Sequence, residues 1–151
     1  LLLQGRDGSF RRSNPGLFEP DAISEDLGAA LFDADGDRDL DLYVVSGGNE
    51  YTGKNPFLLD RLYLNDGKGN FAKSNTIPTL YSNKSSVAVA DIDKDGDQDV
   101  FVGTLADAKA YGVPQHSYLL INDGKANFTL ASDQQINLKI EILEILNLVV
   151  L

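Results

Sequence analysis

The 151-residue sequence contains no cysteine, no methionine and no tryptophan, and it has a single histidine. Without cysteine there is no disulfide, no thiolate metal site and no thiol nucleophile, so cysteine usage does not identify the redox compartment. Without methionine, Leu1 is not an initiator residue, and we expect the sequence to be an internal or processed piece of a longer protein. Whatever stabilises this fold is not sulfur.

Positive charge and long apolar runs are also scarce. The chain has 13 Lys and Arg against 23 Asp and Glu, which gives a formal net charge of −10. Such a surface repels nucleic acid and anionic lipid, so we expect no nucleic-acid partner. The most apolar stretch, residues 140–151, is interrupted by charged and polar residues and falls short of the roughly 18 apolar residues of a membrane span. We therefore expect no membrane insertion.

What the sequence has in abundance is internal repetition. Residues 28–45, GAALFDADGDRDLDLYVV, align with residues 88–103, AVADIDKDGDQDVFVG, at an offset of 60. Residues 64–71, LNDGKGNF, align with residues 121–128, INDGKANF, at an offset of 57, and more weakly with residues 3–10, LQGRDGSF. A fixed period of about sixty residues is typical of propellers and solenoids.

Each repeated element has the pattern of a β-strand or a β-hairpin. Apolar and β-branched residues flank the aspartate-rich segments, and the NDG turns are strong hairpin signals. One repeat is therefore about four strands, and we predict an all-β fold, a partial β-propeller with about two complete four-stranded blades, half a blade and a C-terminal stub. An ordinary β-sandwich is the alternative, but sandwiches rarely repeat a loop and a hairpin at one period.

The period also divides the chain. We predict a half blade and connector over residues 1–27, a blade with the first aspartate loop over 28–85, a blade with the second loop over 86–135, and a tail of uncertain structure over 136–151. The tail suits an inner strand, a short helix or a segment foreign to the repeat. Closed propellers need about 4 to 8 blades, so open blade edges could pair with other copies of the chain.

The aspartate-rich segments place carboxylates at every second position. Like charges about 5 Å apart repel by roughly 1 kcal/mol in water, so these loops are costly to fold without a cation. Calcium takes about 6 to 8 oxygen ligands, which alternate residues of a tight loop can supply while a glycine allows the bend. We therefore predict Ca²⁺ as the cofactor. The predicted ligands in the second loop are Asp91, Asp93, Asp95, Asp97 and Asp99, with Asp97 contributing its backbone carbonyl.

The first loop is predicted to bind calcium more weakly or not at all. At the offset of 60, Leu31 occupies the place of Asp91. The predicted ligands are Asp33, Asp35, Asp37 and Asp39, with Asp37 again contributing its carbonyl. A shifted register that uses Asp33, Asp35, Asp37 and Asp41 is the alternative, although it moves the glycine to the fourth position. A solvated acidic turn without metal also stays open.

An EF-hand loop begins with the same DxDxDG pattern and has to be considered. It requires a bidentate acid at its twelfth position, where this chain has Val102 in the second loop and Val44 in the first. The flanking segments are also strand-like and not helical. The EF-hand is therefore disfavoured.

DIDKDGDQDVFVGT resembles the DxDxDGxxDxxVG core of FG-GAP/VCBS-type repeats, the calcium-bearing blades of integrin-α-like propellers. FDADGDRDLDLYVVSGGNE and LYLNDGKGNF resemble the bacterial secreted branch found beside ASPIC/UnbV domains. The resemblance covers roughly residues 1–135. It implies a seven-bladed or similar extracellular propeller whose calcium ions stiffen the loops, usually for adhesion or ligand binding.

We therefore expect a calcium-binding, non-catalytic module for adhesion, ligand binding or scaffolding, located extracellularly, at the cell surface or in the periplasm. Two alternatives are part of a secreted carbohydrate-active hydrolase and a purely structural segment of a larger surface protein. Catalysis is disfavoured because His116 is isolated and Ser46 has no evident base partner. The ligand, protein or glycan, is unknown, and the candidate binding loops are residues 43–57 and 103–117.

Overall fold

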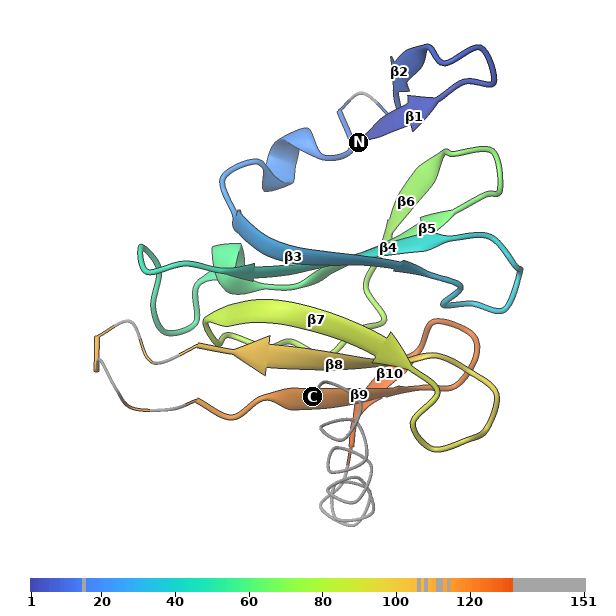
Figure 1. The fold of residues 1–151 in the computed structure, drawn as a ribbon. Coiled ribbons are helices and arrows are strands. Elements are labelled where there is room, and N and C mark those ends of the chain that lie inside the picture. The colour runs from blue at the N-terminus through green and yellow to red at the C-terminus, as the bar shows by residue number, and fades with distance from the viewer. Residues whose placement is uncertain (15, 106, 108, 111–112, 114, 132–151) are drawn as a thin grey trace, which may run out of the picture.

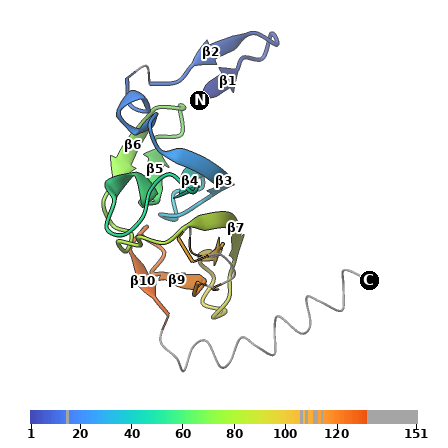
Figure 2. The same ribbon diagram turned by 90° about the vertical axis from the view of Figure 1, so that its left-hand side faces the viewer.

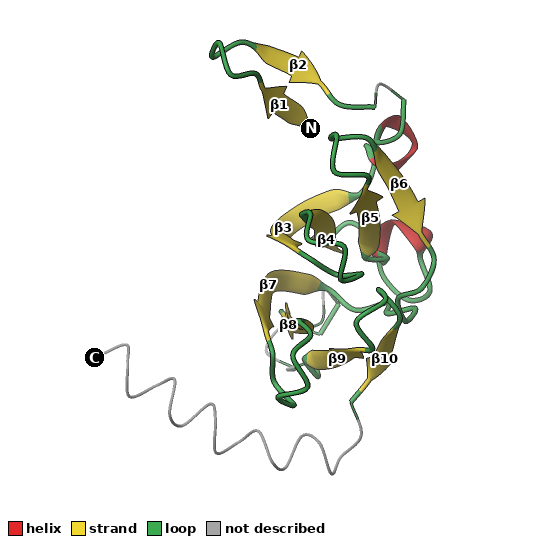
Figure 3. Ribbon diagram, turned by 90° about the vertical axis from the view of Figure 1, so that its right-hand side faces the viewer, coloured by secondary structure: helices red, strands yellow, loops and turns green. Residues whose placement is uncertain are grey.

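The computed structural model describes residues 1–14, 16–105, 107, 109–110, 113 and 115–131. Over these residues the fold is all-β, with three antiparallel sheets of two, four and four strands and two short 3₁₀ turns (Figure 3). None of the three sheets closes on itself. The prediction of a partial propeller is confirmed for this part of the chain, whereas the predicted stub and the tail over 136–151 lie outside the described residues.

The N-terminal sheet is a two-stranded hairpin, and a short connector follows it. The elements are β1 (Leu2–Gln4), β2 (Phe10–Arg12) and the 3₁₀ turn η1 (Glu19–Asp21). Leu3 pairs with Arg11 in the middle of the hairpin. This is the region predicted as half a blade.

Within the described residues, no helix is long and apolar enough to cross a membrane.

Two four-stranded sheets follow, and each is a simple antiparallel meander with its strands in sequence order. The first blade consists of β3 (Glu25–Phe32), β4 (Asp41–Gly47), β5 (Arg61–Asn65) and β6 (Phe71–Ser74), with the 3₁₀ turn η2 (Pro56–Leu58) before β5. The second blade consists of β7 (Lys84–Ala90), β8 (Asp99–Thr104), β9 (Tyr118–Asn122) and β10 (Phe128–Leu130). The two blades therefore repeat one topology.

The blades are stacked face to face, as Figure 2 shows, and β7 packs against β3 and β4. Alternation along each strand sends one set of apolar side chains into the space between the sheets. The buried members of this core are Phe32, Ala34, Tyr43, Val45, Leu62, Leu80, Val100, Val102, Leu120, Ala126 and Phe128. Full burial of one such aliphatic or aromatic side chain stabilises the fold by about 1.5–3 kcal/mol.

The opposite face of the first blade has a smaller core. Leu42, Val44, Tyr63 and Phe71 are buried there, and Leu17 and Phe18 of the connector pack against them. Leu42 and Val44 alternate along β4 with Tyr43 and Val45, which face the second blade. The first blade is thus covered on both faces.

Both aspartate-rich loops lie at one end of the stacked sheets. They connect β3 to β4 and β7 to β8, and in Figure 1 they form the turns at the right-hand end, together with the β5–β6 and β9–β10 hairpins. The connection from β4 to β5, which contains most of the candidate binding loop 43–57, lies at the opposite end. The fold therefore separates the acidic loops from that segment.

Candidate metal centres

The first aspartate loop is folded by its own carboxylates. Asp33 accepts a hydrogen bond at Oδ2 from the Arg38 N–H at 3.0 Å, five residues further along the chain. Asp35 Oδ1 accepts from the Asp37 N–H at 3.3 Å, and Asp37 Oδ1 accepts from the Asp39 N–H at 3.0 Å. Alternate aspartates therefore bend the backbone around a common centre, as short polar side chains do in turns.

The second loop repeats these contacts. Asp91 Oδ2 accepts from the Gly96 N–H at 3.2 Å, again five residues along the chain. Asp93 Oδ1 accepts from the Asp95 N–H at 3.3 Å, and Asp95 Oδ1 accepts from the Asp97 N–H at 3.0 Å. Three equivalent hydrogen bonds in the same order indicate one loop conformation used twice.

A buried aspartate anchors the end of the first loop. Asp41 is the first residue of β4, and its side chain is fully buried. Its Oδ2 accepts from the Ala34 N–H at 2.8 Å, and its Oδ1 accepts from the Asn65 N–H at 2.8 Å. One carboxylate therefore connects the start of the loop to the hairpin between β5 and β6.

Asp99 has the same position and contacts in the second blade. It begins β8, it is fully buried, and its oxygens accept from the Ile92 N–H and the Asn122 N–H, both at 2.9 Å. Leaving either of these amides without an acceptor in a buried position would cost about 1–3 kcal/mol. Asp41 and Asp99 are thus equivalent structural anchors.

These contacts align the two loops at an offset of 58. Asp33 matches Asp91, and Asp41 matches Asp99. The predicted offset of 60 is therefore wrong, and Leu31 does not occupy the place of Asp91. Leu31 lies in β3, pairs with Leu42 and is 52% exposed.

The cause of the error is the position of the glycine. Both loops need a left-handed backbone at the fourth and sixth positions: Gly36 (φ 82°) and Arg38 (φ 74°) in the first, Lys94 (φ 66°) and Gly96 (φ 103°) in the second. Each loop places glycine, the residue that favours this conformation, at one of the two positions and a long basic residue at the other. An alignment that superposes the glycines therefore shifts the loops by two residues.

The corrected register changes the predicted ligand set of the first loop. Asp39 now corresponds to Asp97, and Asp41 corresponds to Asp99. Asp41 is the residue that the preferred sequence alignment missed, although the alternative register contained it. The first loop therefore has an aspartate at each of the positions that carry Asp91, Asp93, Asp95, Asp97 and Asp99 in the second.

In each loop three carboxylate oxygens lie within 4.8 Å of one another. The residues are Asp33, Asp35 and Asp37 in the first loop and Asp91, Asp93 and Asp99 in the second. The other predicted ligands, Asp39, Asp95 and Asp97, lie outside these groups. Opposite ligands of a calcium ion, each about 2.3–2.6 Å from it, are separated by about 5 Å, so the spacing and the all-oxygen donor set fit a hard divalent cation.

The electrostatics of the loops also favour a cation. Burial raises the pKa of Asp93, and the neighbouring Asp99 carboxylate raises it further. Burial likewise raises the pKa of Asp35, with the charges of Asp37 and Asp33 adding to the effect. In the first loop, Asp39 Oδ1 is buried and has no hydrogen-bond donor among the described residues. Each observation indicates negative charge that the protein alone does not compensate.

The aspartates of the NDG hairpins have a different role from those of the two aspartate loops. Asp66 accepts the Lys68 and Asn70 N–H groups at Oδ1, and the Asn70 side chain donates to its Oδ2 at 2.8 Å. The Asn70 side chain lowers the pKa of Asp66 to about 2. Asp123 makes the same contacts in the second blade, with the Asn127 side chain at 2.9 Å. These carboxylates stabilise turns and are not needed for a metal site.

The second blade supports the first loop directly. The Ala34 carbonyl accepts hydrogen bonds from the Asn122 side chain and from the Ala126 N–H, both at 2.8 Å. A Cβ added to Gly36 would lie 3.1 Å from the Gly124 carbonyl oxygen. The first loop is therefore part of the interface between the blades.

The two residues considered for catalysis, Ser46 and His116, do not form a catalytic arrangement. Ser46 is buried, and its hydroxyl oxygen accepts a hydrogen bond from Arg61 Nη2 at 2.8 Å. His116 is exposed, and no hydrogen bond joins it to Ser46 in the described part of the chain. Ser46 therefore has a structural role.

The fold and its repeated loops define a β-propeller-type repeat protein. A family model described as FG-GAP-like repeat matches residues 33–102, from the first aspartate of the first loop into β8. The chain therefore contains an FG-GAP-like repeat, and the predicted resemblance to FG-GAP/VCBS-type repeats is confirmed over a segment that includes both loops. No curated protein matches the chain.

Proposed function

We propose that the chain is a calcium-binding, non-catalytic module of an extracellular β-propeller that serves adhesion, ligand binding or scaffolding. The observation that carries the proposal is the repeated loop, in which the same hydrogen bonds recur at an offset of 58 and three carboxylate oxygens converge to within 4.8 Å. Three carboxylates held this close together repel one another, and a shared cation would remove that cost.

The carboxylates of Asp33, Asp35 and Asp37 would hold one ion, and those of Asp91, Asp93 and Asp99 would hold the other, with Asp95 near the second site. Bound calcium would neutralise the charge that raises the pKa of Asp35 and Asp93. Because the unfolded chain lacks these sites, binding adds to folding stability, by about 2.7 kcal/mol per site when calcium is at 100 times its Kd. Calcium near the millimolar level outside cells suits such sites.

A ligand would bind at the end opposite the calcium loops. A cavity of about 360 Å³ lies there, lined in part by Phe57, Arg61 and Asn75. Phe57 packs against Tyr51 with their ring centroids 5.0 Å apart. Binding loops on a rigid scaffold commonly combine an aromatic with polar groups in this way. FG-GAP repeats are generally non-catalytic, which agrees with a binding role.

Thermal melting tests the metal proposal. We expect calcium to raise the melting temperature above that in excess chelator, and the variants Asp35→Ala and Asp93→Ala each to lose part of this increase. Glu50→Gln is the matched control, because it removes one exposed negative charge far from both loops. Equal melting temperatures with calcium and with chelator would contradict the proposal. Screening on a glycan array, with Phe57→Ala as control, tests the ligand end.

A further inference from the structure

The interface between the blades is mostly apolar but contains one buried ion pair. Tyr43 and Leu62 of the first blade face Val102 of the second within a common core. At the edge of this core the Lys84 ammonium and an Asp60 carboxylate oxygen are 3.1 Å apart, and both side chains are fully buried. Removing two charges from water costs much of the free energy that their attraction returns. A buried ion pair is therefore weak evidence for stability, and we consider another reason for its presence.

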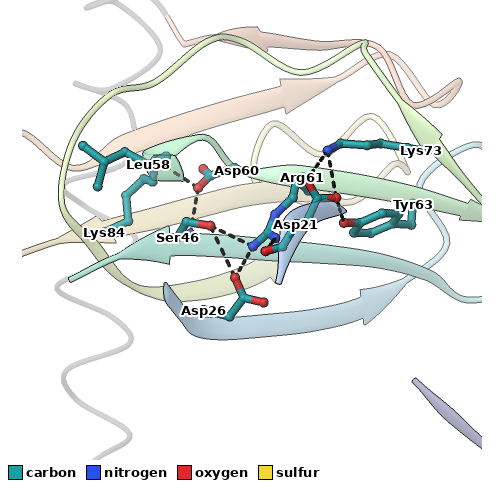
Figure 4. Close-up of polar contacts among 9 residues, drawn as sticks. All are labelled: Asp21, Asp26, Ser46, Leu58, Asp60, Arg61, Tyr63, Lys73 and Lys84. Atoms are coloured by element: carbon teal, nitrogen blue, oxygen red, sulfur yellow. Dashed lines mark hydrogen bonds and ion pairs between the residues drawn. The ribbon is translucent and has the colours of Figure 1, made fainter. Parts of the chain in front are cut away.

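Lys84 is the first residue of the second blade, and its ammonium joins three segments of the chain. Its Nζ donates to the Leu80 carbonyl at 2.8 Å, in the linker between the blades, and to the Leu58 carbonyl in η2. Figure 4 shows Lys84 beside Leu58 and Asp60. With Asp60 Oδ1 as the third partner, the three N–H groups of the ammonium all have an acceptor.

Asp60 is equally well satisfied. Its Oδ2 accepts from the Tyr43 hydroxyl at 3.0 Å, and its Oδ1 accepts from the Ser46 N–H at 3.3 Å. Burial raises the pKa of Asp60 and lowers the pKa of Lys84. Either charge would be unfavourable in this place without the other.

The pair is not part of the repeat. Lys84 pairs with Thr104 directly before a bulge, as Asp26 does with Ser46, so Asp26 is the equivalent of Lys84 in the first blade. Asp60 precedes β5 as Ser117 precedes β9. The polar contact is therefore specific to this one interface, although the strands around it are repeated.

The apolar contacts, by contrast, are repeated. Phe101, Leu119 and Ile121 of the second blade stand at the positions of Tyr43, Leu62 and Leu64, on the face turned away from the first blade. A face of the same apolar character thus occurs on both blades. Apolar burial alone would not distinguish the correct neighbour from another blade of the same or a second chain.

We propose that the Asp60–Lys84 pair selects which blade faces bind one another. If the Asp60 face instead packed against the equivalent face of another first blade, Asp26 would stand in the place of Lys84. The Asp26 carboxylate is already paired with Arg61 of its own blade, so Asp60 would be buried without an ammonium. If the outer face of one second blade packed against the inner face of another second blade, Lys84 would lie opposite Ser117. Lys84 would then be buried without a carboxylate. Only the observed pairing compensates both charges, which disfavours swapped and stacked assemblies.

The test is sedimentation velocity on the 151-residue chain. We expect the apolar double variant Asp60→Leu/Lys84→Met to stay folded, because well-packed apolar replacements of buried ion pairs are often tolerated, and to shift from the wild-type species toward dimers.

The proposal is overturned if the double variant sediments as wild type. It is also overturned if the double variant does not fold, since the pair would then be required for folding itself and not for selecting the partner face. A control removes the ion pair between Lys73 and Asp21, which joins the connector to the first blade at 2.7 Å. The variant Asp21→Leu/Lys73→Met should not shift toward dimers.

Discussion

The two aspartate loops have the same backbone but different surroundings. In the first, the Ala34 carbonyl accepts two hydrogen bonds from the second blade, and Gly36 lies close to the Gly124 carbonyl. In the second, no hydrogen bond from another blade reaches the equivalent carbonyl of Ile92 among the described residues, and a Cβ added at Gly96, the equivalent of Arg38, would meet nothing within 4 Å. The aspartate motif thus determines the loop conformation and the carboxylate cluster, whereas the neighbouring blade determines how firmly the loop is held.

The buried anchors should be the most sensitive positions in both loops. We expect Asp41→Ala and Asp99→Ala each to lower the free energy of unfolding by about 3 kcal/mol, because each leaves one buried and one partly buried N–H group without an acceptor. Urea unfolding in excess chelator measures this without a contribution from calcium. Asp39→Ala is the control, since no N–H group of the described residues donates to its carboxylate. Equal losses for Asp39→Ala and the anchors would contradict the assignment.

The hydrogen bond from Asn122 of the second blade should stabilise the first loop. We expect Asn122→Ala to destabilise the protein by about 1 kcal/mol and to increase amide hydrogen exchange in the first loop, because the Ala34 carbonyl loses one donor. Asn65→Ala is the matched change in the first blade; the Asn65 side chain donates to the Leu40 carbonyl of its own blade at 3.2 Å. The comparison fails if Asn122→Ala leaves exchange in the first loop unchanged.

The pKa of Asp93 and the pKa of Asp41 are raised above the ordinary 3.8 in the calcium-free fold, mainly by burial. A raised carboxyl pKa gives stability that is present below the unfolded value and is lost as pH rises through the folded value. Stability without calcium should therefore increase when the pH falls from neutral toward 4, as urea unfolding would measure. Asp93→Asn should reduce this dependence.

Calcium should reverse that dependence, because protons compete with the ion for the same carboxylates. Asp66, whose pKa is lowered to about 2, contributes stability that is lost only as the pH falls below its ordinary 3.8, and so does not obscure the effect. A calcium-free stability that decreases steadily from pH 7 to 4 would count against the charge crowding described for both loops.

The smallest expected effect concerns the two left-handed basic residues. Arg38 and Lys94 hold positive φ angles of 74° and 66°, which favour glycine. Arg38→Gly and Lys94→Gly should each stabilise the protein by about 0.5–1 kcal/mol, because relief of backbone strain exceeds the added entropy of the unfolded chain. Thermal melting in chelator measures this. A loss of stability in both variants would contradict the left-handed backbone conformation assigned to Arg38 and Lys94.

Much of the fold could be predicted from the sequence because its signals are local. Alternating apolar residues and NDG turns define the strands and hairpins, and the aspartate pattern defines the loops. The register of the first loop could not be settled in this way. Gly36 and Gly96 satisfy two different backbone requirements, so superposing them displaced Asp41 from the predicted ligand set and put Leu31 in the wrong place.

The contacts between the blades could not be predicted from the sequence either. The support of Ala34 by Asn122 and the pairing of Asp60 with Lys84 join residues 88 and 24 positions apart, and neither partner belongs to a local pattern. They depend on how one sheet packs on the next. The predicted ligands of the second loop, by contrast, follow from spacing alone and stay a prediction until metal binding is measured.

Calorimetric titration with calcium tests the central claim most directly. Two equivalent loops at an offset of 58 predict two calcium ions per chain, reduced to one by Asp35→Ala and to one by Asp93→Ala, and unchanged at two by Leu31→Asp. A wild-type chain that binds no calcium, or a first site that appears only in Leu31→Asp, would contradict the account.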